Sequence, residues 1–203
     1  MDRGKIGGLV TAATVEIIPA ADRRRGVACL TLAFSSDPVM RWAWSDPQRY
    51  AEYWPRFAEA FGGAAFDDGT AYGCEGCLGV ALWMRPGVAS DEEAAVGVLG
   101  ESLDDHILED VNGLFEQMGA LHPADVWYLP LIGVDLVAQG RGLGSALLRQ
   151  TLATCDSEGL PAYLEATNPR NRDLYERHGF RVLQVIQAGT SPPLWAMLRE
   201  PAR

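Results

Sequence analysis

The feature that most constrains the fold is the stretch from Val126 to Ser145, in which an apolar segment runs into a turn with three glycines. The apolar segment reads V-W-Y-L-P-L-I-G-V, and the glycines are Gly140, Gly142 and Gly144. An amphipathic segment follows directly. This pattern predicts a buried strand, a glycine turn and a helix. Because glycine has no Cβ atom, the backbone of the turn can approach a ligand closely.

The turn is suited to bind a phosphate. Successive N–H groups of a glycine-rich turn can point toward one anion. The helix that opens at about Gly142 would add unpaired amides and the positive end of its dipole, and Arg141 would add a full charge. We therefore predict a pyrophosphate site here, with a glycine-rich connection that binds nothing as the alternative.

Two other glycine motifs fit the sequence poorly. A nucleoside-triphosphate loop needs a lysine directly after its last glycine, and none follows here. A dinucleotide fingerprint needs a third glycine where Ser145 stands, and five residues separate Val134 from Gly140.

A second motif is L-E-A-T-N-P-R-N-R-D-L-Y-E-R-H-G-F, residues 164–180. Asn168 followed by Pro169 predicts a helix start, and Asn171 and Tyr175 lie one turn apart on that helix. A tyrosine is protonated at neutral pH and can donate its proton to a departing thiolate. The alternative is that Tyr175 only packs beneath the helix.

Taken in order, the strand, the Q-G-R-G-L-G turn, a helix, a strand and N-x-x-x-Y-E-x-x-G-F resemble the GNAT superfamily of acetyltransferases over residues 15–199. D-V-W-Y-L at 125–129 and the closing P-P-L-W-A-M are similar to the group within it that contains puromycin N-acetyltransferase. The resemblance implies an α/β fold with a mixed central β-sheet and helices on both faces. It also implies an acetyl-CoA-dependent N-acetyltransferase.

The resemblance further implies which residues hold acetyl-CoA as a cosubstrate. The backbone of Val134 and Leu136 would hold the pantetheine arm, although Leu136 stands where the family commonly has proline. Asn171 would contact the cosubstrate, and Tyr175 would protonate its sulfur. The predicted pyrophosphate site consists of Gln139, Gly140, Arg141, Gly142, Leu143, Gly144 and Ser145.

The general base is a carboxylate or a water relay in many such enzymes. Glu165, at the carboxyl end of its predicted strand, is the best candidate by order, and a structural hydrogen bond is its alternative role. His106 and His122 have weaker claims, and His178 is expected to be a cation at a helix end. The amine would attack the thioester directly, so no nucleophilic cysteine is needed.

Composition sets wider bounds. A chain of 203 residues with 48% apolar content can bury one full-sized core, so we expect a single domain over 14–203 after a loose arm over 1–13. We expect no membrane span and a cytoplasmic location. The net charge of −10 argues against nucleic-acid binding. The expected partner is a small-molecule amine, with no metal, and the chain is expected to be a monomer or a homodimer.

Several segments leave two interpretations open. No Lys or Arg lies between Arg85 and Arg141, where acidic residues are frequent; a solvated helix face is favoured over steering of a cationic acceptor. The hydrophobic spacing over 96–118 predicts one long helix. Cys74 and Cys77 are expected to lie opposite each other in a hairpin, without metal.

The remaining alternatives concern single side chains and the function itself. Trp42 and Trp44 are expected in the core, with ligand contact as the alternative, and Cys155 is expected to be buried. Two other functions are open: a non-catalytic acyl-CoA binding module, and a dinucleotide-dependent oxidoreductase that would use Glu165 to bind ribose.

Overall fold

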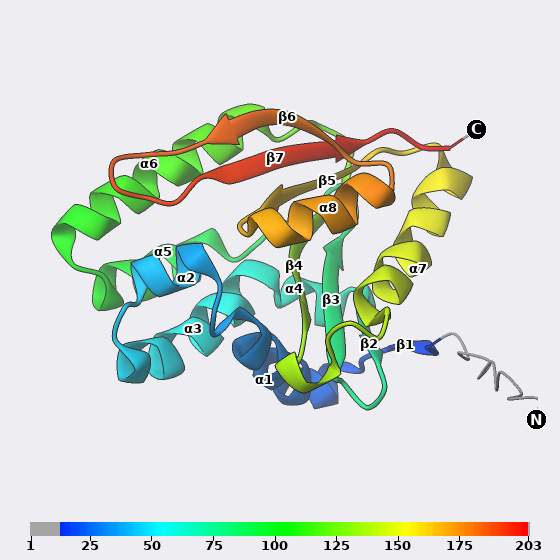
Figure 1. Ribbon diagram of the computed structural model, residues 1–203, viewed down its shortest axis with the longest axis horizontal. Helices are drawn as coiled ribbons and strands as arrows, with labels where there is room; N and C mark the ends of the chain where they lie inside the picture. The colour runs from blue at the N-terminus through cyan, green and yellow to red at the C-terminus, as the bar shows by residue number, and fades with distance from the viewer. Residues whose placement is uncertain (1–12, 203) are drawn as a thin grey trace, which may run out of the picture.

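The computed structural model describes residues 13–202 (Figure 1). The predicted N-terminal arm, 1–13, lies outside the described residues except for Ala13. The strands are β1 (Val15–Ile17), β2 (Ala71–Cys74), β3 (Gly79–Met84), β4 (Trp127–Val134), β5 (Ala162–Ala166), β6 (Arg181–Ile186) and β7 (Leu194–Arg199). The α-helices are α1 (Arg23–Phe34), α2 (Pro38–Ala43), α3 (Pro47–Gly62), α4 (Ala64–Asp67), α5 (Glu92–Ser102), α6 (Asp105–Leu121), α7 (Leu143–Glu158) and α8 (Pro169–Arg177). Two short 3-10 helices are η1 (Ala20–Asp22) and η2 (Leu136–Ala138).

The strands form one seven-stranded sheet in the order β1-β2-β3-β4-β5-β7-β6. The β4–β5 pair is parallel, and the other neighbouring pairs are antiparallel. The sheet is therefore mixed, and helices cover both of its faces. This arrangement confirms the predicted fold class.

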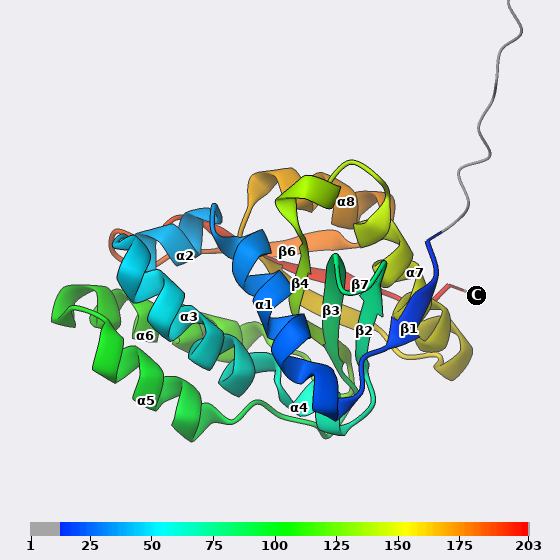
Figure 2. The same ribbon diagram turned by 90° about the horizontal axis from the view of Figure 1, so that it is seen from below.

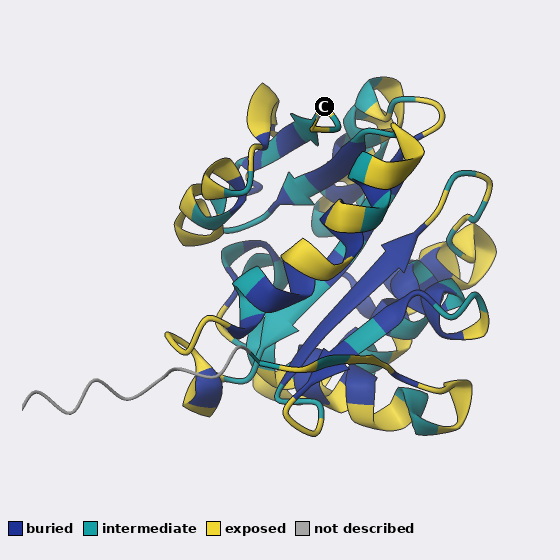
Figure 3. Ribbon diagram, turned by 90° about the vertical axis from the view of Figure 1, so that its right-hand side faces the viewer, coloured by how far each residue is buried: buried dark blue, intermediate teal, exposed yellow. Residues whose placement is uncertain are grey.

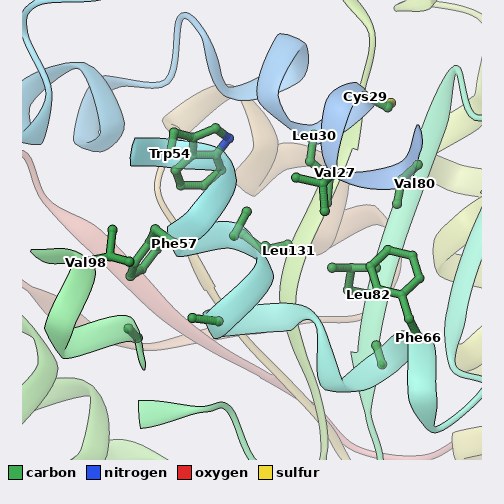
Figure 4. Packing of buried hydrophobic residues seen from close by; sticks show 14 of the residues in the cluster. Val27, Cys29, Leu30, Trp54, Phe57, Phe66, Val80, Leu82, Val98 and Leu131 are labelled. Atoms are coloured by element: carbon green, nitrogen blue, oxygen red, sulfur yellow. The ribbon is translucent and has the colours of Figure 1, made fainter. Parts of the chain in front are cut away.

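The two faces of the sheet are covered by different helices. Side chains alternate along a strand, so Val80 and Leu82 of β3 point to one face and Ala81 and Trp83 to the other. Helices α1 and α3 cover the first face (Figure 2), where their apolar side chains pack onto β3 and β4, and α5 packs on α3 (Figure 4). Helix α7 packs on the second face. The strands between these layers are mostly buried, and the helices expose their outer sides (Figure 3).

Strands β5, β7 and β6 form the other end of the sheet, with α8 on one side and α6 on the other (Figures 1 and 2). Tyr163 of β5 belongs to the hydrophobic cluster of Leu114 in α6. Leu164 belongs to the cluster of Tyr175 in α8. The alternation places Glu165 on the same face as Tyr163.

Strands β4 and β5 pair only at their first residues. Trp127 pairs with Ala162 and Tyr128 with Tyr163, and no later residues of the two strands are paired. Pro130 follows shortly after in β4, and it has no amide hydrogen for the ladder. The two strands therefore separate beyond Tyr128 (Figure 1), and this separation positions the site.

The single helix predicted over 96–118 is wrong, because the chain forms α5 and α6 with a break between them. Leu103 and Asp104 are extended, at ψ 150° and 147°. Ser102 ends α5 with its hydroxyl bonded to the Val98 carbonyl at 2.6 Å, and it also accepts a bond from Trp44. The break lets α5 pack on α3 and α6 turn back toward β6.

The expected pairing of Cys74 with Cys77 is also wrong. Cys74 pairs with Gly79, and residues 75–78 form a longer turn. Glu75 and Cys77 have positive φ angles of 48° and 69° there. Cys155 is fully buried, as predicted.

Candidate functional site

Three cavities follow one another along β4. The first, which we call the glycine-loop groove, has a volume of about 460 Å³ and contacts residues 132–134 of β4. The second, the central chamber, has about 90 Å³ and contacts residues 128–132. The third, the vestibule, has about 630 Å³ and contacts Val126 and Tyr128. Neighbouring cavities share wall residues, so the three lie next to one another along the strand.

The glycine-loop groove contains most of the predicted pyrophosphate site. Its walls include Val134, Gln139, Gly140, Gly142, Leu143, Gly144 and Ser145. Gly140 and Gly142 have φ angles of 75° and 82°, and a Cβ atom on either would meet no heavy atom within 4 Å. The cradle is thus open because both residues lack a side chain. The Gln139 side chain donates to the Val134 carbonyl at 3.2 Å and braces the loop.

Helix α7 begins at this groove with uncapped amides. Its first helical hydrogen bond runs from the Ala146 amide to the Gly142 carbonyl at 3.0 Å, and Gly142 offers no capping side chain. The amides of Leu143, Gly144 and Ser145 precede that bond, so they lack helical partners. Together with the helix dipole they form a site for an anion.

Two predicted residues do not face the groove. Arg141 forms an ion pair with Glu75 at 2.5 Å, which holds its guanidinium at the β2–β3 turn. Leu136 lies in η2, is half exposed and does not line the groove. The Arg141 side chain is therefore engaged outside the groove, and the predicted backbone contact of Leu136 with the pantetheine arm stays a prediction.

Sequence reasoning missed two cations that line the groove, Arg170 and Arg177 of α8. They are seven residues apart, which is two helical turns, so they lie on one side of α8. Leu174 lies between them and also lines the groove. The seven-residue spacing of these arginines in the sequence could have identified them as two cations on one side of the helix that carries Asn171 and Tyr175.

His178 is not the helix-end cation that was expected. Burial lowers its pKa, as do Arg149, Arg177 and Arg199 nearby. Its Nε2 atom lies 3.0 Å from the Ser145 hydroxyl oxygen. A neutral His178 therefore links the end of α8 to the first turn of α7.

Asn171 and Tyr175 lie where the groove meets the central chamber, because both residues line both cavities. Tyr175 is buried, with 5% of its surface exposed, and its ring packs edge-on against Phe180 at 6.0 Å. Burial raises the pKa of its phenol, and nearby Asp37 raises it further. Tyr175 therefore keeps its proton at neutral pH and presents it in the chamber wall.

Asp37 fastens helix α2 to the end of β5. One carboxylate oxygen accepts the amides of Val39 and Met40 at 3.0 and 3.2 Å and caps α2. The other accepts the Thr167 hydroxyl at 2.6 Å. Since α2 lines the central chamber, this buried carboxylate fixes one of its walls.

Glu165 lies where the central chamber meets the vestibule, because it lines both cavities. Its Oε2 atom accepts the Tyr128 hydroxyl at 2.9 Å. Its Oε1 atom is buried and has no hydrogen-bond partner among the described residues. Burial raises the pKa of Glu165 to about 7, although the hydroxyl groups of Tyr128 and Tyr163 lower it. A carboxyl group of this pKa can take a proton near neutral pH.

The other predicted candidates contribute less. His106 is exposed on α6 and lines none of the three cavities. His122 lines the vestibule, and burial lowers its pKa. Trp44 is in the core, as predicted, and Trp42 is only partly buried in the chamber wall, where it donates to Thr190 at 3.2 Å.

Many acidic side chains of the Lys- and Arg-free span face solvent, as the favoured interpretation predicted. Glu101 pairs with Arg56 at 2.6 Å and Asp104 with Arg49 at 3.2 Å. Within residues 13–202, no three acidic, histidine or cysteine side chains gather as metal ligands. No helix in this part of the chain has both the length and the apolar content to cross a membrane.

The chain is similar to known acetyltransferases. The family described as Acetyltransferase (GNAT) family matches residues 32–180. An uncharacterised N-acetyltransferase of Schizosaccharomyces pombe is 29% identical over an alignment 202 residues long. The alignment covers 91% of this chain and 82% of that protein.

Solved structures of acetyltransferases share the fold. A Corynebacterium glutamicum protein described as histone acetyltransferase HPA2 and related acetyltransferase superposes with a TM-score of 0.67 at 27% identity, over 95% of this chain and 98% of that one. Arylalkylamine N-acetyltransferase 2 of Aedes aegypti superposes with a TM-score of 0.65 at 14% identity, over 95% and 100% of the two chains. Because the family match spans most of the sequence and the fold agrees, the chain belongs to the GNAT family and is an N-acetyltransferase.

Proposed function

We propose that the protein transfers the acetyl group of acetyl-CoA directly to the primary amine of a small molecule. The observation that carries this proposal is the central chamber, which has Tyr175 at one end and Glu165 at the other. A groove suited to pyrophosphate lies beyond Tyr175, and a vestibule lies beyond Glu165. The two substrates therefore approach one small chamber from opposite ends.

The glycine-loop groove fits the diphosphate of coenzyme A. Free amides at the start of α7, an open cradle at Gly140 and Gly142, and the guanidinium groups of Arg170 and Arg177 all favour a polyanion. The unpaired edge of β4 beyond Tyr128 offers backbone groups to the amides of the pantetheine arm. The thioester then lies beside Asn171 and Tyr175.

The chamber residues divide the proton transfers between them. An acceptor that arrives as an ammonium ion first gives one proton to solvent. As the neutral amine nitrogen then bonds to the acetyl carbon, Glu165 takes the second proton that this nitrogen loses. As the carbon–sulfur bond breaks, the Tyr175 hydroxyl gives its proton to the sulfur. The proton held by Glu165 restores that of Tyr175 through solvent, so the products are an amide and the free thiol of coenzyme A. General acid and base groups typically accelerate such steps by about 10²–10⁴-fold each.

A thermal-shift measurement with acetyl-CoA tests the groove assignment. A ligand that binds only the folded state raises the melting temperature by mass action. Gly142→Ala adds a methyl group at the glycine turn. It is expected to raise the dissociation constant of acetyl-CoA at least about tenfold, which is a loss of about 1.4 kcal/mol of binding free energy. Gly159→Ala is the matched control, since Gly159 caps the other end of α7 with φ 69° and equally open surroundings. Equal melting shifts in the two variants would refute the assignment.

An amine-dependent assay tests the transfer itself. Acetyl-CoA and a panel of primary amines should yield free thiol and acetylated amine in equal amounts. If acetyl-CoA binds but no amine is acetylated, the protein is a non-catalytic acyl-CoA binding module instead. Family membership leaves the oxidoreductase alternative without support.

A further inference from the structure

The vestibule is large enough to hold most of a small organic molecule. Its volume of about 630 Å³ falls within the usual range of ligand pockets, whereas the central chamber has only about 90 Å³. The chamber can therefore hold the reacting groups but not the body of an acceptor. That body must lie in the vestibule, on the far side of Glu165 from the glycine-loop groove.

Apolar and aromatic side chains form the inner wall of the vestibule. Phe61, Leu99, Phe115 and Met118 line it at the chamber end. Phe61 packs edge-on against Phe115 at 5.9 Å and against Tyr128 at 6.4 Å, so aromatic rings form this part of the wall. A polar chain placed here would lose its bonds to water without gaining partners.

The charges of the vestibule are acidic. Glu92 and Asp125 lie at its exposed rim, and Glu165 lies at its inner end. Arg85 also lines it, but the guanidinium of Arg85 is paired with Asp68. The remaining carboxylates attract a cation, and Glu165 is the one that lies toward the central chamber.

We infer that the acceptor is a primary amine with an apolar, preferably aromatic, body that occupies the vestibule while its nitrogen reaches Glu165. This inference rests on the proposed acetyl transfer. It excludes polyamines and lysine residues of proteins as preferred acceptors, because the second charge of a polyamine and the polar peptide backbone around a lysine do not match the apolar wall.

Gly119 offers a way to close the vestibule without disturbing the core. This glycine is an exposed residue of α6 in the vestibule wall. A Cβ atom added to it would meet no heavy atom within 4 Å. Gly119→Phe would therefore add a ring at this part of the vestibule wall. Gly97→Phe on α5 is the matched control, because Gly97 is also an exposed helical glycine with open surroundings but does not line the vestibule.

The experiment compares kcat/KM for 2-phenylethylamine, 1,6-diaminohexane and a lysine-containing peptide, at saturating acetyl-CoA. The wild-type protein should prefer 2-phenylethylamine by about tenfold or more, since even small apolar groups change kcat/KM by that order. Gly119→Phe should lower kcat/KM for 2-phenylethylamine about tenfold, mainly through KM, and keep the acetyl-CoA melting shift. Gly97→Phe should stay within about twofold of wild type.

Three results would overturn the inference. The first is equal or higher kcat/KM with the diamine or the peptide. The second is an equal effect of Gly119→Phe and Gly97→Phe on 2-phenylethylamine. In both cases acetyl transfer itself stands. The third is an unchanged melting temperature on addition of acetyl-CoA to the wild type, which overturns the proposed function and this inference with it.

Discussion

Tyr175 reaches the central chamber from α8, and its hydroxyl is the group that we assign to protonate the departing thiolate. Tyr175→Phe keeps the ring and its contact with Phe180 and removes only the hydroxyl. Loss of a general acid should lower kcat about 10²–10⁴-fold while the dissociation constant of acetyl-CoA changes little. The measurement is kcat by thiol release, under conditions where chemistry limits turnover. A kcat within a few-fold of wild type would show that Tyr175 only packs or positions.

Glu165 predicts a specific pH dependence of the rate. As a general base it must be ionised, and burial raises its pKa to about 7. The rate constant kcat/KM should therefore rise with pH through about 7 and level off above it. Glu165→Gln should have a much lower rate that no longer titrates in this range. A wild-type profile that is flat between pH 6 and 8 would contradict the assignment.

The same carboxyl group predicts how stability changes with pH. Its folded-state pKa of about 7 exceeds the unfolded value of about 4.5, so the folded state binds the proton more tightly. This contribution is present below about pH 4.5 and is lost as pH rises through about 7. The melting temperature of Glu165→Gln relative to wild type should therefore increase from pH 5 to pH 8. A constant difference would mean that Glu165 is not buried in this way.

At the scale of residues, features that depend on one segment of the chain are easier to predict from the sequence than features that depend on contacts between distant segments. The glycines at 140 and 142 are recognisable because their backbone conformation requires glycine. Arg141 has the right charge, but its partner Glu75 is distant in sequence, and this ion pair has no local signal. The raised pKa of Glu165 likewise depends on burial, which the assembled fold creates.

At the scale of elements, helix α2 should depend on its cap at Asp37. Asp37→Ala removes two bonds to amides and the bond from Thr167, whereas Asp46→Ala removes one bond to an amide at the start of α3. Loss of a cap costs about 1 kcal/mol. Asp37→Ala should lower the melting temperature more than Asp46→Ala, because it also leaves Thr167 without its acceptor. It should also raise the KM for the amine several-fold, since α2 lines the chamber.

Thermal melts and amine saturation curves of both variants provide the check. Equal melting temperatures together with an unchanged KM would show that Asp37 does not hold α2 over the chamber. A lower melting temperature with unchanged KM would limit its role to stability.

Element types were easier to predict than element ends. Periodicity indicates helical structure over 96–118, but it continues across the break between α5 and α6 because Leu103 is buried like its helical neighbours. The bond that Trp44 donates to Ser102 stabilises the end of α5. This contact joins distant parts of the chain, although Ser102 and Asp104 are residue types that favour helix ends.

At the scale of the whole molecule, the central chamber and the glycine-loop groove lie where β4 and β5 separate. The α/β class with a mixed sheet was predictable from the order of motifs, since these resemble a known family. The vestibule was not, because it is assembled from α5, α6 and the segments around Arg85 and His122. Its shape depends on the break after Ser102, which hydrophobic spacing does not reveal.

The central claim is that both substrates occupy the neighbouring cavities at once and react directly in the chamber. Initial rates measured while the concentrations of acetyl-CoA and 2-phenylethylamine are both varied test this claim most directly. Direct transfer requires a ternary complex, so double-reciprocal plots should intersect. Parallel lines, together with thiol release from acetyl-CoA before any amine is added, would indicate a covalent acetyl-enzyme and contradict direct transfer.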